Sequence, residues 1–256
     1  MNDPSIFPHD APEFAEDKPL VPSAVPLDSS MEWIKQGWAF FSAQPSVWIA
    51  TTAIFIAITV GLFLIPFVGV PLAAAFFPFS VAGFMNLCAR LSEDKPLEVT
   101  DFFEVIRLEQ IRPIAALSAF YALVVIVIYG VLQLFGWGNA VTQIFKLESG
   151  PLIIGVAIGI MLLIPLLILM IFIPMLLAIW LFPMLVLYNK LSLRAALGVI
   201  ANALIKNILP FFVYGIILLI LSLFAIVPAG VGFLVLIPVL AGAAYAAYHD
   251  IFVIHP

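Results

Sequence analysis

Four long stretches of the chain carry no lysine, arginine, aspartate or glutamate, and each exceeds the roughly 20 residues that a helix needs to cross a bilayer core. These stretches cover residues 36–89, 113–145, 149–189 and 207–248. Lipid-exposed backbone must satisfy its own hydrogen bonds, and the residues do not alternate in polarity as barrel strands do, so the pattern predicts helices. The predicted spans are six, over residues 46–65, 68–89, 113–135, a part of 151–188, 208–227 and 230–248.

A shorter amphipathic pattern precedes the first span. Between residues 31 and 45, apolar side chains recur at helical spacing, and charged or polar residues fall largely between them. Tryptophan prefers the headgroup region of a membrane, and lysine reaches water from there. The stretch therefore predicts a helix that lies in the cytoplasmic membrane interface, is anchored by Trp33 and Trp38, and turns into the membrane near Pro45.

The same pattern recurs before the third and fifth spans. In residues 100–113, Thr100 or Asp101 can cap a helix, and its expected apolar face is Phe102, Phe103 and Ile106. In residues 192–210, Ser192 can cap a helix, and its expected apolar stripe is Leu193, Leu197, Ile200 and Leu204. An interfacial helix followed by a two-span hairpin, used three times, predicts an internal repeat. The alternative is that any cytoplasmic loop between apolar spans looks amphipathic.

The chain is thus predicted to be an all-α integral membrane protein with three cytoplasmic interfacial amphipathic helices, and residues 31–256 form its six-helix transmembrane domain. Residues 1–30 hold six prolines and six acidic residues, which predicts a disordered, proline-rich cytoplasmic tail. With the N-terminus inside, nine of the ten lysines and arginines fall on the cytoplasmic side. We expect a bacterial inner-membrane location with both termini in the cytoplasm. A net charge of −5 gives no basic surface for nucleic acid.

Residues 151–188 are too long for one straight span, because 38 helical residues would extend about 57 Å across a core of about 30 Å. Two spans there would move the three basic residues of 190–206 to the outside and would place an apolar turn in water. A proline removes a helical donor and disturbs the preceding turn, so bends are expected where prolines occur. We expect one long helix with bends at Pro165, Pro174 and Pro183. The sequence leaves open whether residues 151–165 are transmembrane or interfacial.

Three motifs carry a resemblance to known proteins: "WIKQGWAFF", "LIPFVGVPLAAAFFPFSVAGFMNLCARL" and "PVLAGAAYAAYHDIF". Through them the chain, over residues 31–252, resembles a family of uncharacterised proteobacterial multi-pass inner-membrane proteins. It is distantly similar to the membrane domain found attached to some glycerophosphodiester phosphodiesterases. The resemblance implies an inner-membrane location and the plan of interfacial helices and hairpins. No residues here correspond to the catalytic barrel of the distant relative, so its hydrolase activity is not implied.

Polar residues gather where the second, fourth and sixth spans reach the cytoplasmic side, and we call this set the polar rim: Asn86, Arg90, Asn189, Lys190, His249 and Asp250. Ionisable groups inside a membrane usually mark proton relays, ion paths or substrate sites, and the predicted spans contain none. The three histidines lack metal-ligand spacing. The single cysteine, Cys88, reads as a small packing residue. We therefore predict no catalytic residue, cofactor or metal.

Two functions follow from these observations. The first is a non-enzymatic scaffold, assembly or regulatory component of a membrane complex, whose partners are the lipid bilayer and a membrane protein. The alternative is a carrier or lipid-handling protein without a charged relay in the membrane, in which scattered polar residues line a path: Thr59, Tyr121, Tyr129, Gln133 and Tyr214. The motif Gly242-x-x-x-Ala246 permits close helix approach, which we expect within one chain. The sequence does not determine the oligomeric state.

Overall fold

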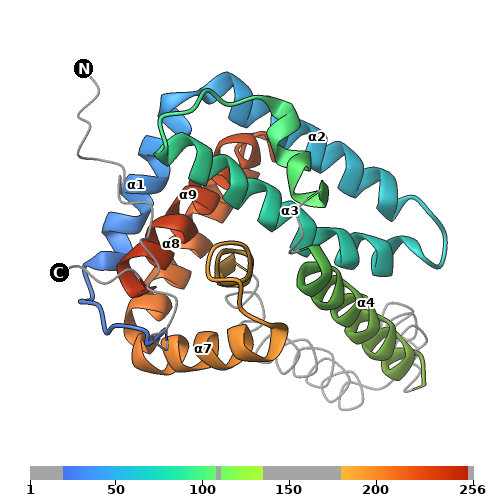
Figure 1. Ribbon diagram of the computed structural model, residues 1–256. Coiled ribbons are helices and arrows are strands. Elements are labelled where there is room, and N and C mark those ends of the chain that lie inside the picture. Colours follow the sequence, from blue (N-terminus) through green and yellow to red (C-terminus); the bar gives the residue numbers. More distant parts are fainter. Residues whose placement is uncertain (1–19, 108–110, 135–179, 253–256) are drawn as a thin grey trace, which may run out of the picture.

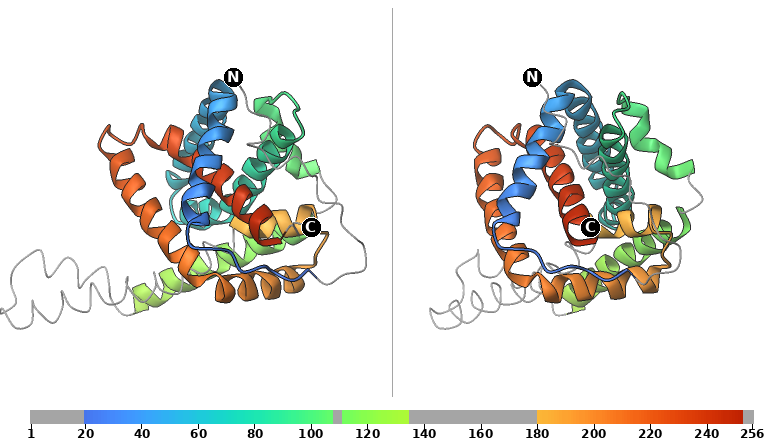
Figure 2. Two further views of the ribbon diagram at one scale, coloured as in Figure 1. Left: turned by 90° about the vertical axis from the view of Figure 1, so that its left-hand side faces the viewer. Right: turned by 60° about the vertical axis from the view of Figure 1, so that its left-hand side comes forward.

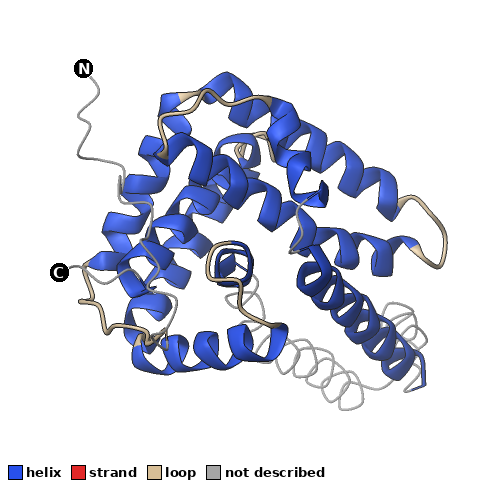
Figure 3. Ribbon diagram, in the orientation of Figure 1, coloured by secondary structure: helices blue, strands red, loops and turns tan. Residues whose placement is uncertain are grey.

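The computed structural model describes residues 20–107, 111–134 and 180–252 (Figure 1). Within these ranges all regular secondary structure is helical, in agreement with the predicted all-α class (Figure 3). The named helices, in chain order, are α1 (Ser29–Ala43), α2 (Pro45–Phe63), α3 (Gly69–Ser92), η2 (Val99–Arg107), α4 (Ile111–Leu134), α7 (Leu193–Lys206), α8 (Ile208–Ile226) and α9 (Phe233–Phe252). Residues 180–187 form a further helical segment.

Five of these helices are long and apolar enough to cross a membrane: α2, α3, α4, α8 and α9. Their bounds lie within a few residues of the five helices predicted outside residues 151–188. The remaining predicted span falls mostly outside the described residues, together with Pro165 and Pro174. Pro183 lies within the helical residues 180–187. The sixth span and the bends at these prolines therefore stay predictions.

Two helices, α3 and α9, form the centre of the described structure. In the most apolar stretch of each helix, 61% of the residues of α3 and 72% of those of α9 are buried. The corresponding share is 22% in each of α2, α4 and α8. α9 contacts α1, α2, α3 and α8. A run of small buried residues in α9 lets the neighbouring backbones approach. The outward faces of α2, α4 and α8 carry large apolar side chains, as expected of helices that face lipid.

α1 crosses α9 at two glycines (Figure 2). A Cβ atom added to Gly37 would lie 2.1 Å from the carbonyl oxygen of Val239. A Cβ atom added to Gly242 would lie 2.9 Å from the Cα atom of Gly37. Such distances are far inside van der Waals contact, so neither position has room for a side chain. The close approach expected at Gly242 within one chain is confirmed.

The prediction that Trp33 anchors the first helix at the membrane surface is wrong. Its side chain is 1% exposed, and its indole N–H donates to Oδ2 of Asp250 at 3.0 Å. Its ring packs against Phe211 and Tyr214 of α8. This face of α1 is covered by α8 and α9, so its apolar residues meet protein instead of lipid. Trp38 is 55% exposed, so its side chain does lie on the surface.

The chain turns from α1 into α2 at Gln44, whose backbone leaves the helical region with φ −142° and ψ 66°. Pro45 then begins α2, where its missing N–H removes no helical bond. The fully buried Trp48 donates its indole N–H to the carbonyl of Phe40 at 2.9 Å. That carbonyl is in the last turn of α1. A side chain of α2 thus fixes the end of α1, and the turn predicted near Pro45 is confirmed.

α1, η2 and α7 each precede a span, and we call them the elbow helices. The second, η2, is a 3₁₀-helix rather than the predicted amphipathic α-helix. Phe102 and Val105 are buried, whereas Ile106, expected on the same face as Phe102, is 60% exposed. With three residues per turn, side chains three positions apart align. Phe102 and Val105 therefore share the buried face, and Ile106 points away from it.

The third elbow helix, α7, begins as predicted, because Oγ of Ser192 accepts a hydrogen bond from the backbone N–H of Ala195 at 3.4 Å. The predicted stripe is only partly right. Leu197 is 41% exposed, and the fully buried positions are Ala196, Ile200 and Ala203. The stripe was predicted from the large apolar side chains of the helix. Closely packed helices favour small side chains at their contacts, so the observed contact face includes the alanines instead.

Candidate functional site: the polar rim

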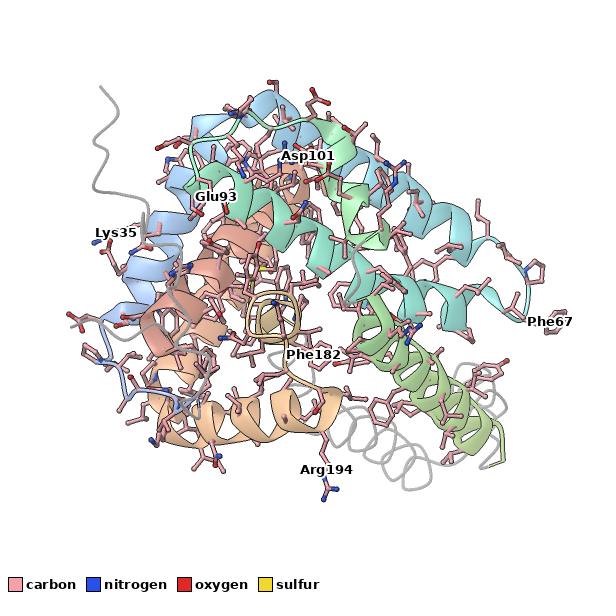
Figure 4. The ribbon with its side chains drawn as sticks, in the orientation of Figure 1. Lys35, Phe67, Glu93, Asp101, Phe182 and Arg194 are labelled. Carbon is pink, nitrogen blue, oxygen red and sulfur yellow. The ribbon has the colours of Figure 1, made fainter. Side chains whose placement is uncertain are left out.

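Asn86 and Arg90, in the last turns of α3, both bind η2. Nδ2 of Asn86 donates to the carbonyl of Asp101 at 2.8 Å. Arg90 forms ion pairs with two carboxylates, through Nε at 3.0 Å from Oδ2 of Asp101 and through Nη1 at 3.2 Å from Oε2 of Glu104. The Asp101 side chain is 4% exposed and lies between α3 and η2 (Figure 4). Its carboxylate therefore depends on Arg90 for its counter-charge.

Two further contacts fix η2 on α3. Oδ2 of Asp101 accepts a hydrogen bond from the backbone N–H of Glu98 at 2.7 Å, which orders the residue just before η2. Asp101 was expected as the N-cap of a helix, but η2 begins at Val99, and Asp101 lies in its first turn and bonds back to the residue before the helix. A Cβ atom added to Gly83 of α3 would lie 2.5 Å from the carbonyl oxygen of Phe102. The backbone of η2 thus rests directly on α3.

A second group of rim residues joins α9 to its neighbours. The hydroxyl of Tyr248 donates to Oδ1 of Asn189 at 2.7 Å, which connects α9 to the helical segment that precedes Asn189. The hydroxyls of Tyr245 and Ser92 are 2.9 Å apart and connect α9 to α3. His249 is 5% exposed, and its ring centroid lies 4.7 Å from that of Tyr245. These side chains hold three helix ends together.

The remaining rim residues are Asp250 and Lys190. Asp250 accepts the indole hydrogen bond of Trp33 and so joins α9 to α1. Lys190 is exposed, with a φ of 52° in the turn before α7. Asn86, Arg90, Asn189 and Asp250 each bond to a residue outside the rim. These four residues therefore serve as ties between helices.

The segment over residues 20–27, which we call the N-terminal strap, runs along α7 and the end of α9 (Figure 2). The backbone N–H of Ser23 donates to the carbonyl of Ile251 at 2.8 Å. Nζ of Lys206 donates to the carbonyl of Pro22 at 3.0 Å. The strap thus connects the beginning of the described chain to its end.

The predicted boundary of the tail at residue 30 is wrong. α1 already begins at Ser29, and residues 20–28 include the bonded strap. Residues 1–19 lie outside the described residues. The boundary predicted from composition was wrong because the strap is held mainly through its backbone N–H and C=O groups. Every residue type carries these groups, so amino-acid composition does not reveal such bonds.

Asn207 stands between α7 and α8, is 1% exposed, and holds the strap with its amide. Oδ1 of Asn207 accepts from the backbone N–H of Val25 at 2.8 Å. Nδ2 donates to the carbonyl of Ser23 at 2.9 Å and to that of Ala203 at 3.0 Å. The buried amide is thus well satisfied, as a polar group removed from water must be.

Gln44 occupies the corresponding position between α1 and α2. Its Oε1 accepts from the backbone N–H of Leu97 at 3.2 Å. Leu97 comes just before η2, as Val25 comes shortly before α1. In both cases an amide at an elbow binds the segment that leads into another elbow helix. Sequence analysis missed Gln44 and Asn207, although Gln44 directly precedes Pro45 and Asn207 is the first residue of a charge-free stretch.

Replacing Asn207 by alanine is expected to release the strap. The substitution removes three hydrogen bonds of a buried side chain, and one unsatisfied buried partner costs about 1–3 kcal/mol. Hydrogen–deuterium exchange should become at least tenfold faster over residues 20–27. Asn202→Ala is the matched control, because Asn202 is an exposed residue of α7, the helix that Asn207 follows. Equal exchange of the strap in both variants would contradict the role assigned to Asn207.

The residues expected to line a path have mixed positions. Tyr121 and Tyr214 are buried, whereas Tyr129 is 63% exposed. Thr59 donates its hydroxyl to a carbonyl of its own helix at 2.8 Å. The side chain of Gln133 lies outside what the structure describes. Among the described side chains of this set, Tyr121 and Tyr214 are thus the buried ones.

No set of three histidine, cysteine, aspartate or glutamate side chains suited to a metal occurs among the described residues. Cys88 is fully buried in α3, in keeping with its interpretation as a packing residue. No protein-family model, no curated protein and no solved structure matches the chain. The resemblance stated from its motifs therefore stays a prediction.

Proposed function

We propose that the protein is a non-enzymatic scaffold, an assembly or regulatory component of a complex in a bacterial inner membrane. The observation that carries this proposal is the use of the polar rim. Arg90 and Asp250 of the rim each tie an elbow helix to a long apolar helix, and Asn207, outside the rim, ties the strap to the junction of α7 and α8. Ties of this kind hold a fixed surface on the membrane, and a binding surface works best on rigid elements.

We further propose six spans, both termini in the cytoplasm, and elbow helices that lie in the cytoplasmic interface as parts of three repeats. The distribution of basic residues supports this orientation. Two parallels support the repeat. η2 rests on α3 at Gly83 as α1 rests on α9 at Gly242. Gln44 and Asn207 bind equivalent segments.

Reporter fusions test the orientation. A reporter fused after Lys95 is expected to give a cytoplasmic signal, and one fused after Gly138 a periplasmic signal. Lys95 lies in the loop between α3 and η2, on the side of the elbow helices. Reversed signals would refute the proposed orientation and with it the placement of the elbow helices.

Purification in mild detergent followed by quantitative mass spectrometry tests the scaffold. A stoichiometric membrane-protein partner is expected with the wild-type chain. The Gly37→Ala variant should no longer bind this partner, because the substitution disturbs the contact of α1 with α9. The Gly198→Ala variant should still bind it, because the added methyl group meets nothing within 4 Å. The two variants are compared at equal amounts of purified protein. Recovery of lipid alone with the wild type would argue against a scaffold.

One observation favours the carrier alternative. The hydroxyls of Thr51 and Thr52 in α2 and of Ser118 in α4 are buried, and none has a hydrogen-bond partner in the described part of the chain. A polar path would use such groups. If they serve only packing, Thr51→Val should raise the apparent Tm, because it removes an unsatisfied buried hydroxyl. A loss of co-purified lipid or solute in Thr51→Val would instead support a carrier.

A further inference from the structure

The two described hairpins end in turns without a single polar side chain. We call residues 64–68, between α2 and α3, and residues 227–232, between α8 and α9, the hairpin tips. The surrounding sequence is apolar, proline or glycine throughout residues 60–79 and 223–244. A loop that projects into water normally contains polar residues, because solvated backbone and turns favour them. The composition of both tips therefore disagrees with an aqueous location.

The tip side chains are nevertheless not packed against the protein. Phe67 is fully exposed and points away from every helix (Figure 4). Leu64 is 78% exposed, and Val227, in the other tip, is 80% exposed. Large apolar side chains exposed in two separate tips require an apolar environment outside the chain.

The lengths of the hairpin arms place the tips at a definite depth. α2 and α8 each contain 19 residues, which corresponds to about 28 Å along the helix axis. Both begin directly at an elbow, so they start near the cytoplasmic boundary of the membrane. The hydrocarbon core is about 30 Å thick, and an average tilt of about 20° shortens the reach further. The tips therefore end inside the far leaflet.

The backbone of the tips is suited to that environment. In the first tip, the N–H groups of Leu64, Ile65 and Val68 donate to carbonyls of the same hairpin, and Pro66 has no N–H. In the second tip, Gly230 donates to Ile226 in the same way, and the next residue donates to the carbonyl of Pro228. Moving a backbone group from water into lipid costs less free energy when the group is hydrogen-bonded within the protein.

We infer that both hairpin tips are embedded in the far leaflet of the bilayer, where their exposed side chains contact phospholipid acyl chains. The two described hairpins then present no surface to the far aqueous side, and a soluble partner of these hairpins must bind on the side of the elbow helices. This inference rests on the proposed placement of the elbow helices in the cytoplasmic interface.

Depth-dependent fluorescence quenching tests the inference in the intact chain. Single cysteines at Phe67→Cys, Val227→Cys and Arg194→Cys, in a Cys88→Ala background, are labelled with an environment-sensitive dye. The proteins are reconstituted in vesicles of phosphatidylethanolamine and phosphatidylglycerol. Quenching is measured with acyl-chain nitroxide lipids and with iodide present on both sides of the membrane. Arg194 is the control, because its side chain points away from the helices (Figure 4).

Probes at Phe67 and Val227 are expected to be quenched several-fold more by nitroxide lipids than the Arg194 probe, and several-fold less by iodide. Iodide quenching of both tip probes at the level of the Arg194 probe would overturn the inference and leave the orientation intact. Shielding of the tips from both quenchers would also overturn it, since protein would then cover them. An Arg194 probe quenched by lipid and not by iodide would refute the placement of the elbow helices themselves.

Discussion

Gly37→Ala is expected to destabilise the protein by about 3 kcal/mol, at the upper end of the usual range for overpacking. The added methyl carbon would lie 2.1 Å from the carbonyl oxygen of Val239 and 2.8 Å from the backbone nitrogen of Ala243. Both atoms belong to the backbone of α9, so no side chain can rotate away, and α1 must move as a whole. The apparent Tm should fall by roughly 6–12 °C for a chain of this size. The buried thiol of Cys88 allows a thiol-reactive dye to report unfolding.

The matched control is Gly198→Ala in α7, another elbow helix. A Cβ atom at Gly198 meets nothing within 4 Å. Alanine favours a helix over glycine by about 0.8–1.0 kcal/mol, so this variant should be as stable as the wild type or slightly more so. If both variants melted at the same temperature, the contact of α1 with α9 would not have the tightness that the structure assigns to it.

Features with a local cause were predictable from sequence. The spans follow from the length of charge-free stretches, and the end of the first elbow helix follows from Pro45, which cannot continue the helical hydrogen bonds of α1. The cap at Ser192 and the close approach at Gly242 are equally local, because each depends on the chemistry of one residue and its immediate neighbours. The structure confirms five helices long and apolar enough to span, the end of the first elbow helix, the cap and the close approach, whereas the sixth span stays a prediction.

Whether other helices cover an apolar helix face was not predictable from the sequence. Trp33 and Trp38 are both apolar, aromatic and part of one amphipathic pattern, yet the first is buried against α8 and the second is exposed. Periodicity reports which residues avoid water, and lipid and protein both satisfy that requirement. Ile106 was misplaced because η2 has three residues per turn, and Leu197 because the alanines of α7 form its contact face. Only the positions of the neighbouring helices decide between the two environments.

The ties of the polar rim and of Asn207 were not predictable either, because they join residues far apart in the chain. Asn207 and Val25 are separated by 182 residues, and Trp33 and Asp250 by 217. A single sequence contains no record of such pairs. The rim residues themselves were found by their position at the ends of charge-free stretches, but their pairing with Asp101, Trp33 and Tyr248 became visible only in the fold.

Arg90→Met is expected to destabilise the protein by about 3 kcal/mol, because it leaves the carboxylate of Asp101 buried without its cation. The Asp101 side chain is 4% exposed, and Arg90 is 30% exposed, so water screens this pair only in part. Lys95→Met is the matched control. Lys95 pairs with Glu93 at the exposed surface of the adjacent loop, where an ion pair contributes about 0–1 kcal/mol. Apparent Tm values in detergent measure both effects.

A second substitution separates the loss of charge balance from the loss of packing. Asparagine at position 101 is neutral and can still accept the hydrogen bond from the backbone N–H of Glu98. The double variant Arg90→Met with Asp101→Asn should therefore recover to within about 1 kcal/mol of the wild type, since replacing both members of a buried pair is often nearly neutral. If the double variant were as unstable as Arg90→Met alone, the contribution of Arg90 would come from the packing of its side chain between α3 and η2. Asp101 would then not need a counter-charge, and the first of the ties that support a scaffold would have to be withdrawn.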